Sequence, residues 1–269
     1  MRWHRLARKN VRDAMRSWSL YGVVGLFLVL GGTVGYLAGG ADSSAGSVVF
    51  PLTVRLMTFL VPVVALGLTY ESVAGPRTSG SLQFLLALPY DRRDVVVGTY
   101  AGRLALLGAA VCVGYLMLAA SMLLRGVPVP PLALLTVLGL VLLLAAAFVA
   151  IGVGLSTAAR STTVAGGLAF LVFFLFFLVW GSVPGIVAFV LNGFSPPASQ
   201  PSWAPPFRAL NPLAAFQAVA AATVSAGGTM PAAPGPETVR SLPLSVAVLA
   251  GWTLLTPLAG YLRFRDDDL

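Results

Sequence analysis

The chain has 269 residues, of which 58% are hydrophobic and only 10% are charged, and its mean hydropathy is +0.89. Soluble domains carry about 25% charged residues, so this composition excludes an ordinary soluble protein and predicts a polytopic membrane protein. The net charge is +8, but six of the 17 lysines and arginines precede residue 17, beside the first apolar run. Such a flank is typical of a cytoplasmic membrane anchor and argues against a nucleic-acid-binding surface.

The chain begins with a basic segment in which Trp3, Leu6 and Val11 alternate with arginines. This pattern predicts an N-terminal interfacial helix, which serves either to anchor the chain to lipid head groups or to contact a cytoplasmic partner. The next apolar run covers residues 20–40. Apolar regions of signal peptides are about 7–15 residues long, so we expect this longer run to be a retained span.

Six apolar runs in total are long enough to cross a bilayer. Their predicted limits are residues 20–40, 50–70, 100–124, 132–156, 163–183 and 244–262. We therefore predict an all-α polytopic membrane protein that forms one transmembrane domain over residues 1–269.

The distribution of basic residues predicts the orientation of these spans. With the N-terminus inside the cell, 13 lysines and arginines lie on the cytoplasmic side, and four lie outside: Arg55, Arg125, Arg208 and Arg240. Cytoplasmic loops of membrane proteins carry the excess of basic residues. We therefore expect a multi-pass protein of the plasma membrane with both termini in the cytoplasm.

A charged insert, residues 71–94, separates the second and third spans. Within it, Ser79 or Thr78 is suited to cap a short helix, which Pro89 would end because the residue before proline avoids helical geometry. Asp91 would then cap the third span. The apolar positions of the short helix follow helical spacing: Leu82, Leu85 and Leu86. A connector this long, with its own apolar face, predicts a surface that docks a cytoplasmic partner.

Three charged residues of the insert are candidates for the docking site. Arg92 and Arg93 precede the third span, and reversal of their charge should disturb a docked partner. Glu71 ends the second span. Its carboxylate is either solvated, paired with Arg77 or Arg103, or involved in transmitting the partner's movement to the spans.

The region between the fifth and sixth spans, residues 184–240, is predicted to be external. It continues with apolar residues to Leu191, passes through a proline-rich stretch, and then reads as a short helix over Leu210–Ser225 that Asn211 and Pro212 open. Two arrangements remain open. The region forms either re-entrant or interfacial helices, or a loose external loop.

Residue types that would supply an energy source or a catalytic centre are missing from the sequence. There is no GxxxxGK[ST] motif, and Lys9, His4 and Cys112 are each the only residue of their type. An ATP-binding P-loop, a cysteine or histidine metal site and a Ser–His catalytic pair are therefore not expected, and no span carries two carboxylates for ion coupling. Spacings of the type Gly31-xxx-Gly35 and Gly98-xxx-Gly102 carry little weight among 29 glycines.

The insert and the overall layout resemble permease subunits of type-2 ABC exporters. The resemblance is strongest to the branch linked to maturation of multicopper enzymes, including nitrous-oxide reductase. The matching positions are Glu71, Gly80-Ser81-Leu82, Leu85-Leu86, Pro89, and Arg92 or Arg93. The family commonly has Gly-Lys at the entry to the third span, where this chain has Gly98-Thr99.

The resemblance implies that residues 71–94 contain a coupling helix that docks an ABC ATP-binding subunit. It also implies a homodimer or a heterodimer with another permease, ATP and magnesium bound only by the partner, no cofactor or metal in this chain, and export of a substrate. The apolar spans favour lipid-like cargo, whereas the resemblance favours a role in sulfur or metal maturation. The alternative functions are a non-transporting membrane scaffold or assembly factor and, less favoured, a secondary transporter.

Overall fold

The computed structural model describes residues 3–15, 17–38, 45–87, 90–129, 131–196, 199–225 and 242–265, and every regular element in these ranges is a helix. Six helical segments are long and apolar enough to span a membrane. The predicted all-α class with six spans is therefore confirmed. The elements are α1 (Trp3–Met15), α2 (Trp18–Ala38), α3 (Ala45–Thr69), α4 (Ala74–Thr78), α5 (Ser81–Ala87), α6 (Arg92–Leu124), α7 (Pro131–Ala158), α8 (Thr162–Phe174), η1 (Leu175–Val179), η2 (Trp180–Ser182), α9 (Val183–Leu191), α10 (Ala204–Ala209), α11 (Pro212–Ser225) and α12 (Leu242–Arg265).

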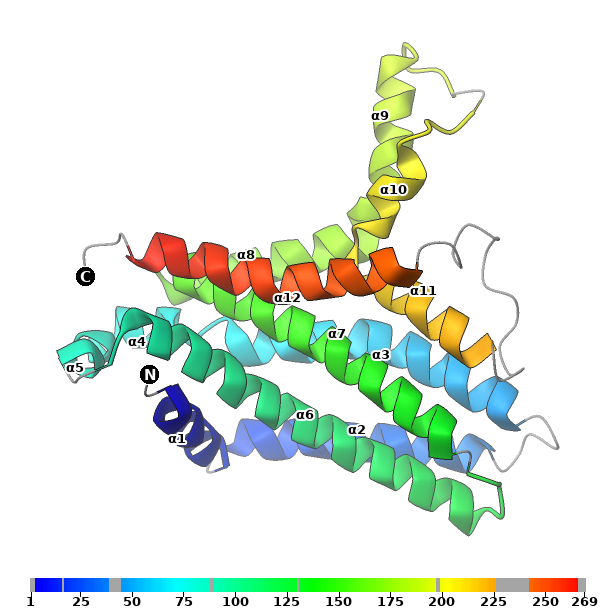
Figure 1. Cartoon of the computed structure of the whole chain (residues 1–269), viewed down its shortest axis with the longest axis horizontal. Helices are drawn as coiled ribbons and strands as arrows, with labels where there is room; N and C mark the ends of the chain where they lie inside the picture. Colours follow the sequence, from blue (N-terminus) through cyan, green and yellow to red (C-terminus); the bar gives the residue numbers. More distant parts are fainter. Residues whose placement is uncertain are drawn as a thin grey trace.

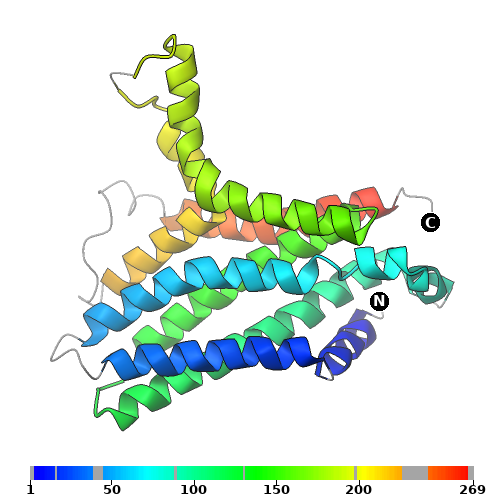
Figure 2. The same cartoon turned by 180° about the vertical axis from the view of Figure 1, so that it is seen from behind.

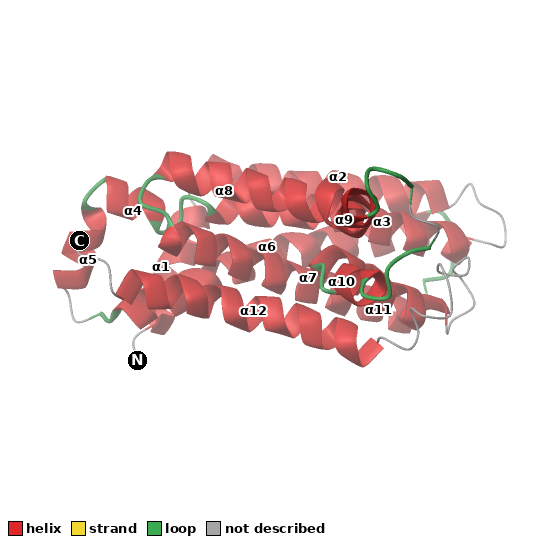
Figure 3. Ribbon diagram, turned by 90° about the horizontal axis from the view of Figure 1, so that it is seen from above, coloured by secondary structure: helices red, strands yellow, loops and turns green. Residues whose placement is uncertain are grey.

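The long helices lie side by side along one axis, as Figure 3 shows from above. At least half of the apolar stretch of α3, α6 and α7 is buried, whereas α2, α8 and α12 are mostly exposed. Leucine, valine and phenylalanine cover these exposed faces, which suits contact with lipid. The buried helices therefore form the centre of the bundle.

Glycines allow the helices to cross at short distances. A methyl group at position 35 of α2 would lie 2.5 Å from the Leu118 carbonyl oxygen of α6, and one at position 154 of α7 would lie 2.5 Å from the Thr256 carbonyl oxygen of α12. Small residues are the usual means by which membrane helices approach one another. The Gly31 and Gly35 spacing, to which the sequence analysis gave little weight, therefore marks a real helix contact.

One end of the bundle carries both ends of the described chain together with α1, α4, α5 and the turn between α7 and α8 (Figures 1 and 2). The connections from α2 to α3 and from α6 to α7 lie at the opposite end, with α11 nearby. Helix α6 starts at Arg92, eight residues before the predicted limit of 100. The hydropathy pattern missed this first part because it is charged and lies where α6 contacts α1.

The chain leaves the bundle after α8. It bends through the π-helical turn η1 and the short η2, so that α9 and α10 stand away from the other helices (Figure 1). The Asn211 side-chain amide donates to the Phe176 carbonyl oxygen (2.7 Å), and the Asn211 side-chain oxygen accepts from the Leu213 N–H (2.8 Å). Asn211 thus joins the bend to the start of α11, which follows the helix predicted from Asn211 and Pro212.

Candidate coupling site at one end of the bundle

The site begins where α3 ends. Residues 70–73 form a turn, and the two N–H groups that open α4 have no side-chain cap of their own. The Ser156 hydroxyl of α7 accepts hydrogen bonds from the N–H groups of Val73 (3.0 Å) and Ala74 (3.1 Å) and donates to the Tyr70 carbonyl oxygen (2.7 Å). Since free N–H groups at a helix start need a partner, Ser156 anchors α4 to the bundle.

Helix α5 is the structural counterpart of the predicted coupling helix. It begins at Ser81 and not directly after Ser79, because Thr78 is the last residue of α4 and Gly80 has a φ of +73°, which a right-handed helix cannot include. Leu82 is buried, with 1% of its surface exposed, while Ser79 lies exposed in the turn. Helix α5 also contains Leu85 and Leu86, and Pro89 falls outside the described residues.

Phe84 is the prominent exposed residue of α5, with 79% of its surface accessible. It lies two positions after the buried Leu82, on a seven-residue helix at the end of the bundle. An aromatic ring outside the apolar spans is costly to leave in water and is a residue type enriched in protein–protein anchors. The sequence analysis missed Phe84, although an aromatic residue between the predicted docking leucines was a usable signal.

Arg92 and Arg93 bind the last turns of α12. Arg92 donates to the carbonyl oxygens of Phe264 and Arg265, the latter at 2.9 Å, and Arg93 Nε donates to the Tyr261 hydroxyl at 2.8 Å. Asp91 occupies the position before α6 but makes no side-chain capping bond there. The two arginines therefore hold the third and sixth spans together, a role that the sequence analysis did not consider.

The Phe264 side chain is fully buried between two arginines. The guanidinium carbons of Arg77 and Arg92 lie 5.3 and 5.2 Å from the centre of its ring. These distances are within the about 6 Å range of cation–π attraction. Arg77 also donates to the Ala159 carbonyl oxygen at 3.0 Å. The ring thus connects α4, α6 and α12 at one point.

Glu71 lies exposed in the turn between α3 and α4. Its carboxylate accepts a hydrogen bond from the Tyr70 hydroxyl at 2.7 Å. Among the alternatives for Glu71, the structure thus adds a neighbour, Tyr70, that the sequence analysis did not propose.

Helix α1 packs against the start of α6 through two glycines. A methyl group at position 98 would lie 2.7 Å from the Leu6 Cβ atom, and one at position 102 would lie 2.8 Å from the Asn10 Cβ atom. A cavity of about 130 Å³ lies beside this contact, and residues of α1, α5 and α6 line it, among them Lys9 and Leu82. Helices α1 and α5 therefore belong to one structural unit.

The described residues contain no group of three or more His, Cys, Asp or Glu side chains placed to hold a metal ion. The site is instead built from arginines, hydroxyl groups and aromatic rings around exposed short helices. This arrangement suits the binding of a protein surface and the transfer of its movement to α3, α6, α7 and α12, to which these residues are bonded.

Comparison with known proteins places this architecture in a family. The family model for the ABC-2 family transporter protein matches residues 4–269. The chain belongs to the ABC-2 transporter family. It is 32% identical over 192 residues to a probable ABC transporter permease protein NosY of Stutzerimonas stutzeri, covering 66% of this chain and 67% of that protein. It is 29% identical over 262 residues to the protein of the same name from Pseudomonas aeruginosa, covering 93% and 94% of the two chains.

These matches confirm the predicted family and the branch that the motif in residues 71–94 indicated. The protein is the membrane-spanning permease subunit of an ABC transporter, a multi-pass membrane protein that is not itself catalytic.

Proposed function

We propose that the ABC-2 permease docks a separate ATP-binding subunit on α5, with the end of the bundle that carries α1, α4 and α5 facing the cytoplasm. Both termini then lie in the cytoplasm. Phe84 is the observation that carries this proposal, because an exposed aromatic ring on a short helix next to a buried anchor is typical of a protein-binding contact. ATP and magnesium belong to the partner. Two permease copies, or one copy with a related permease, complete the transporter.

In the proposed mechanism, ATP binding closes the pair of ATP-binding subunits and moves α5. The movement passes through the hydrogen bonds of Ser156 to α7 and through the Arg77–Phe264–Arg92 contact to α6 and α12. ATP can shift the spans only to the extent that the partner binds the two conformations of α5 differently. The resemblance to exporters supports outward transport.

The decisive experiment uses Phe84→Ala in the full-length permease, co-expressed with the P-loop protein encoded beside it. We expect co-purification and permease-stimulated ATP hydrolysis to fall about tenfold or more, because an interface aromatic residue of this kind contributes on the order of 2 kcal/mol. The matched control is Phe194→Ala, which removes an equally exposed ring, 71% accessible, beyond the end of α9. Unchanged ATPase stimulation in Phe84→Ala, or an equal loss in Phe194→Ala, would contradict docking on α5.

Reversing the charges of Arg92 and Arg93 is a poorer test than it seemed from the sequence. Both side chains bond to α12, so their replacement would detach the sixth span whether or not a partner binds. Phe84 has no such role within the described fold, and its replacement leaves the helix contacts intact.

A further inference from the structure

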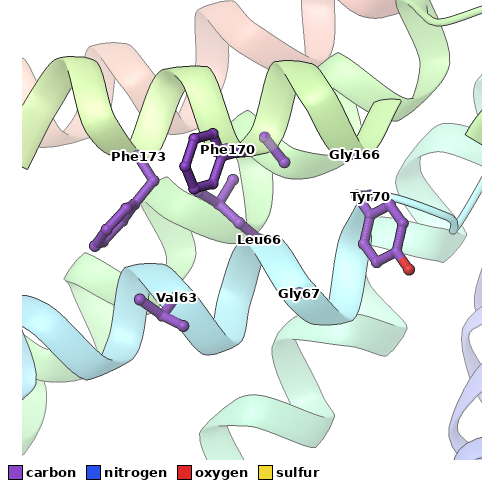
Figure 4. Close-up of a pocket in the computed structure, with 8 residues that line it drawn as sticks. Val63, Leu66, Gly67, Tyr70, Gly166, Phe170 and Phe173 are labelled. Carbon is purple, nitrogen blue, oxygen red and sulfur yellow. The ribbon is translucent and has the colours of Figure 1, made fainter. Parts of the chain in front are cut away.

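A groove of about 490 Å³ runs between α3 and α8, in the half of the bundle nearest the coupling site (Figure 4). Its walls are apolar and partly aromatic, with Phe170 and Phe173 contributed by α8. Small-molecule sites in proteins measure about 300–1,000 Å³ and have mostly apolar walls with a few polar groups. The groove has the size and lining of such a site.

The two ends of the groove differ in chemistry. At the deeper end, Phe59 of α3 packs edge-on against Phe173 and Phe177 of α8, with ring centres 5.7 and 5.4 Å apart. At the other end stands Tyr70, whose hydroxyl bonds to the Glu71 carboxylate. The groove is therefore closed by aromatic rings inside the membrane and ends in a carboxylate at its surface.

Two glycines create the space. A methyl group at position 67 would have no atom within 4 Å, and one at position 166 would touch only the Tyr70 ring, at 3.5 and 3.6 Å. The groove is thus an open volume that larger side chains would fill without any backbone clash.

We propose that this groove holds the single hydrocarbon chain of an amphiphile whose head group is an ammonium or a hydroxyl. The apolar walls take up the chain, and the Glu71 carboxylate accepts hydrogen bonds from the head group, a charge-assisted contact in the case of ammonium. A carboxylate at the mouth disfavours fatty acids and other anionic head groups. The inference rests on the proposed function, for which it names the substrate class: an amphiphile that enters from the cytoplasmic leaflet.

The test is photolabelling of the full-length protein in phosphatidylcholine nanodiscs, without ATP or an ATP-binding partner. The probe is hexadecylamine with a photoreactive diazirine in its chain, and labelled sites are read by peptide mass spectrometry. We expect labelling of α3 and α8 that unlabelled hexadecylamine competes away. The change Gly67→Leu should lower this competed labelling about tenfold, which corresponds to about 1.4 kcal/mol of binding free energy, with Gly67→Ala intermediate.

The matched control is Gly139→Leu on α7, where an added side chain also meets no atom within 4 Å and which lies outside the groove. It should label like the original protein, and the thermal midpoints of all variants should agree. The change Glu71→Gln should reduce the preference for the amine over a diazirine-bearing hexadecanoic acid. Equal labelling by amine and acid in the original protein would overturn the head-group assignment and with it the proposal.

Two further results would also overturn it. One is labelling that does not saturate, or that Gly67→Leu leaves unchanged, since the groove would then hold only bulk lipid. The other is efficient oxidative cross-linking between two copies of a Cys112→Ser, Phe170→Cys variant, since a second copy would then fill the groove. Because no ATPase partner is present, a failure here leaves docking on α5 untouched, and a failure of docking leaves the labelling result valid.

Discussion

Ser156 shows how a single hydroxyl can determine where a helix breaks. Its oxygen takes part in three hydrogen bonds with the backbone between Tyr70 and Ala74, although it lies more than 80 residues further along the chain. The side chain is fully buried, so no water can replace these bonds. The turn that separates α3 from α4 therefore depends on α7.

We predict that Ser156→Ala lowers the free energy of unfolding by about 1–3 kcal/mol, the cost of leaving buried N–H groups without an acceptor. Thr136→Ala on the same helix is the matched control. The Thr136 hydroxyl donates only to the Leu132 carbonyl oxygen within α7, so the change should cost less than about 0.5 kcal/mol. Denaturant titration in mild detergent measures both values. Equal effects of the two changes would show that Ser156 is not an anchor of α4.

At the scale of elements, the contact of α1 with α6 depends on the absence of side chains at positions 98 and 102. The α1 backbone approaches so closely that a methyl group at position 98 would lie 2.9 Å from the Trp3 carbonyl oxygen. Backbone atoms cannot move aside as a flexible side chain can. Any larger residue at this position must displace the whole helix.

We expect Gly98→Ala to loosen α1, and trypsin to cleave at its exposed arginines about tenfold faster, since overpacking of a tight contact costs about 1–3 kcal/mol. Gly108→Ala in the same helix is the control. Its added methyl group would meet only the Leu142 side chain, at an ordinary 3.5 Å. Limited proteolysis followed by mass spectrometry gives both rates. Identical cleavage of the two variants would contradict the importance of the glycine contact.

The sequence predicted the helices better than the contacts between them. Long apolar runs identify spans because a bilayer demands about 20 apolar residues, whatever the neighbours are. The role of Arg92 was not predictable in this way, because its acceptors lie 172 and 173 residues away. The glycines of α2 and α6 were visible in the sequence, but in a chain with 29 glycines only the packed structure separates contact glycines from lipid-facing ones.

For the whole molecule, the charge distribution and the fold agree. Arg77, Arg92, Arg93 and Arg160 lie at the end of the bundle that carries α1 and its basic residues, whereas Arg125 lies at the opposite end, over the ring of Tyr36. Basic residues favour the cytoplasmic side. This agreement supports the proposed orientation, with α5 exposed to a cytoplasmic partner.

The orientation leads to a labelling prediction in a Cys112→Ser background. In intact cells, a membrane-impermeant maleimide should modify Pro128→Cys, in the connection between α6 and α7, and should modify Arg160→Cys only after the membrane is permeabilised. Both native residues are exposed, so accessibility within the fold is comparable. Labelling of Arg160→Cys in intact cells would place the coupling site outside and contradict the proposed topology.

The contact of Arg92 with α12 has a consequence for the time course of biosynthesis. Its acceptors are made about 170 residues later, a delay of roughly 10–30 s at about 5–20 residues per second. Until then the Phe264 ring that Arg77 and Arg92 enclose does not exist. A newly made chain therefore completes its coupling site only when the sixth span has been inserted, so that a partner sensitive to this site would recognise finished permeases and ignore those still on the ribosome.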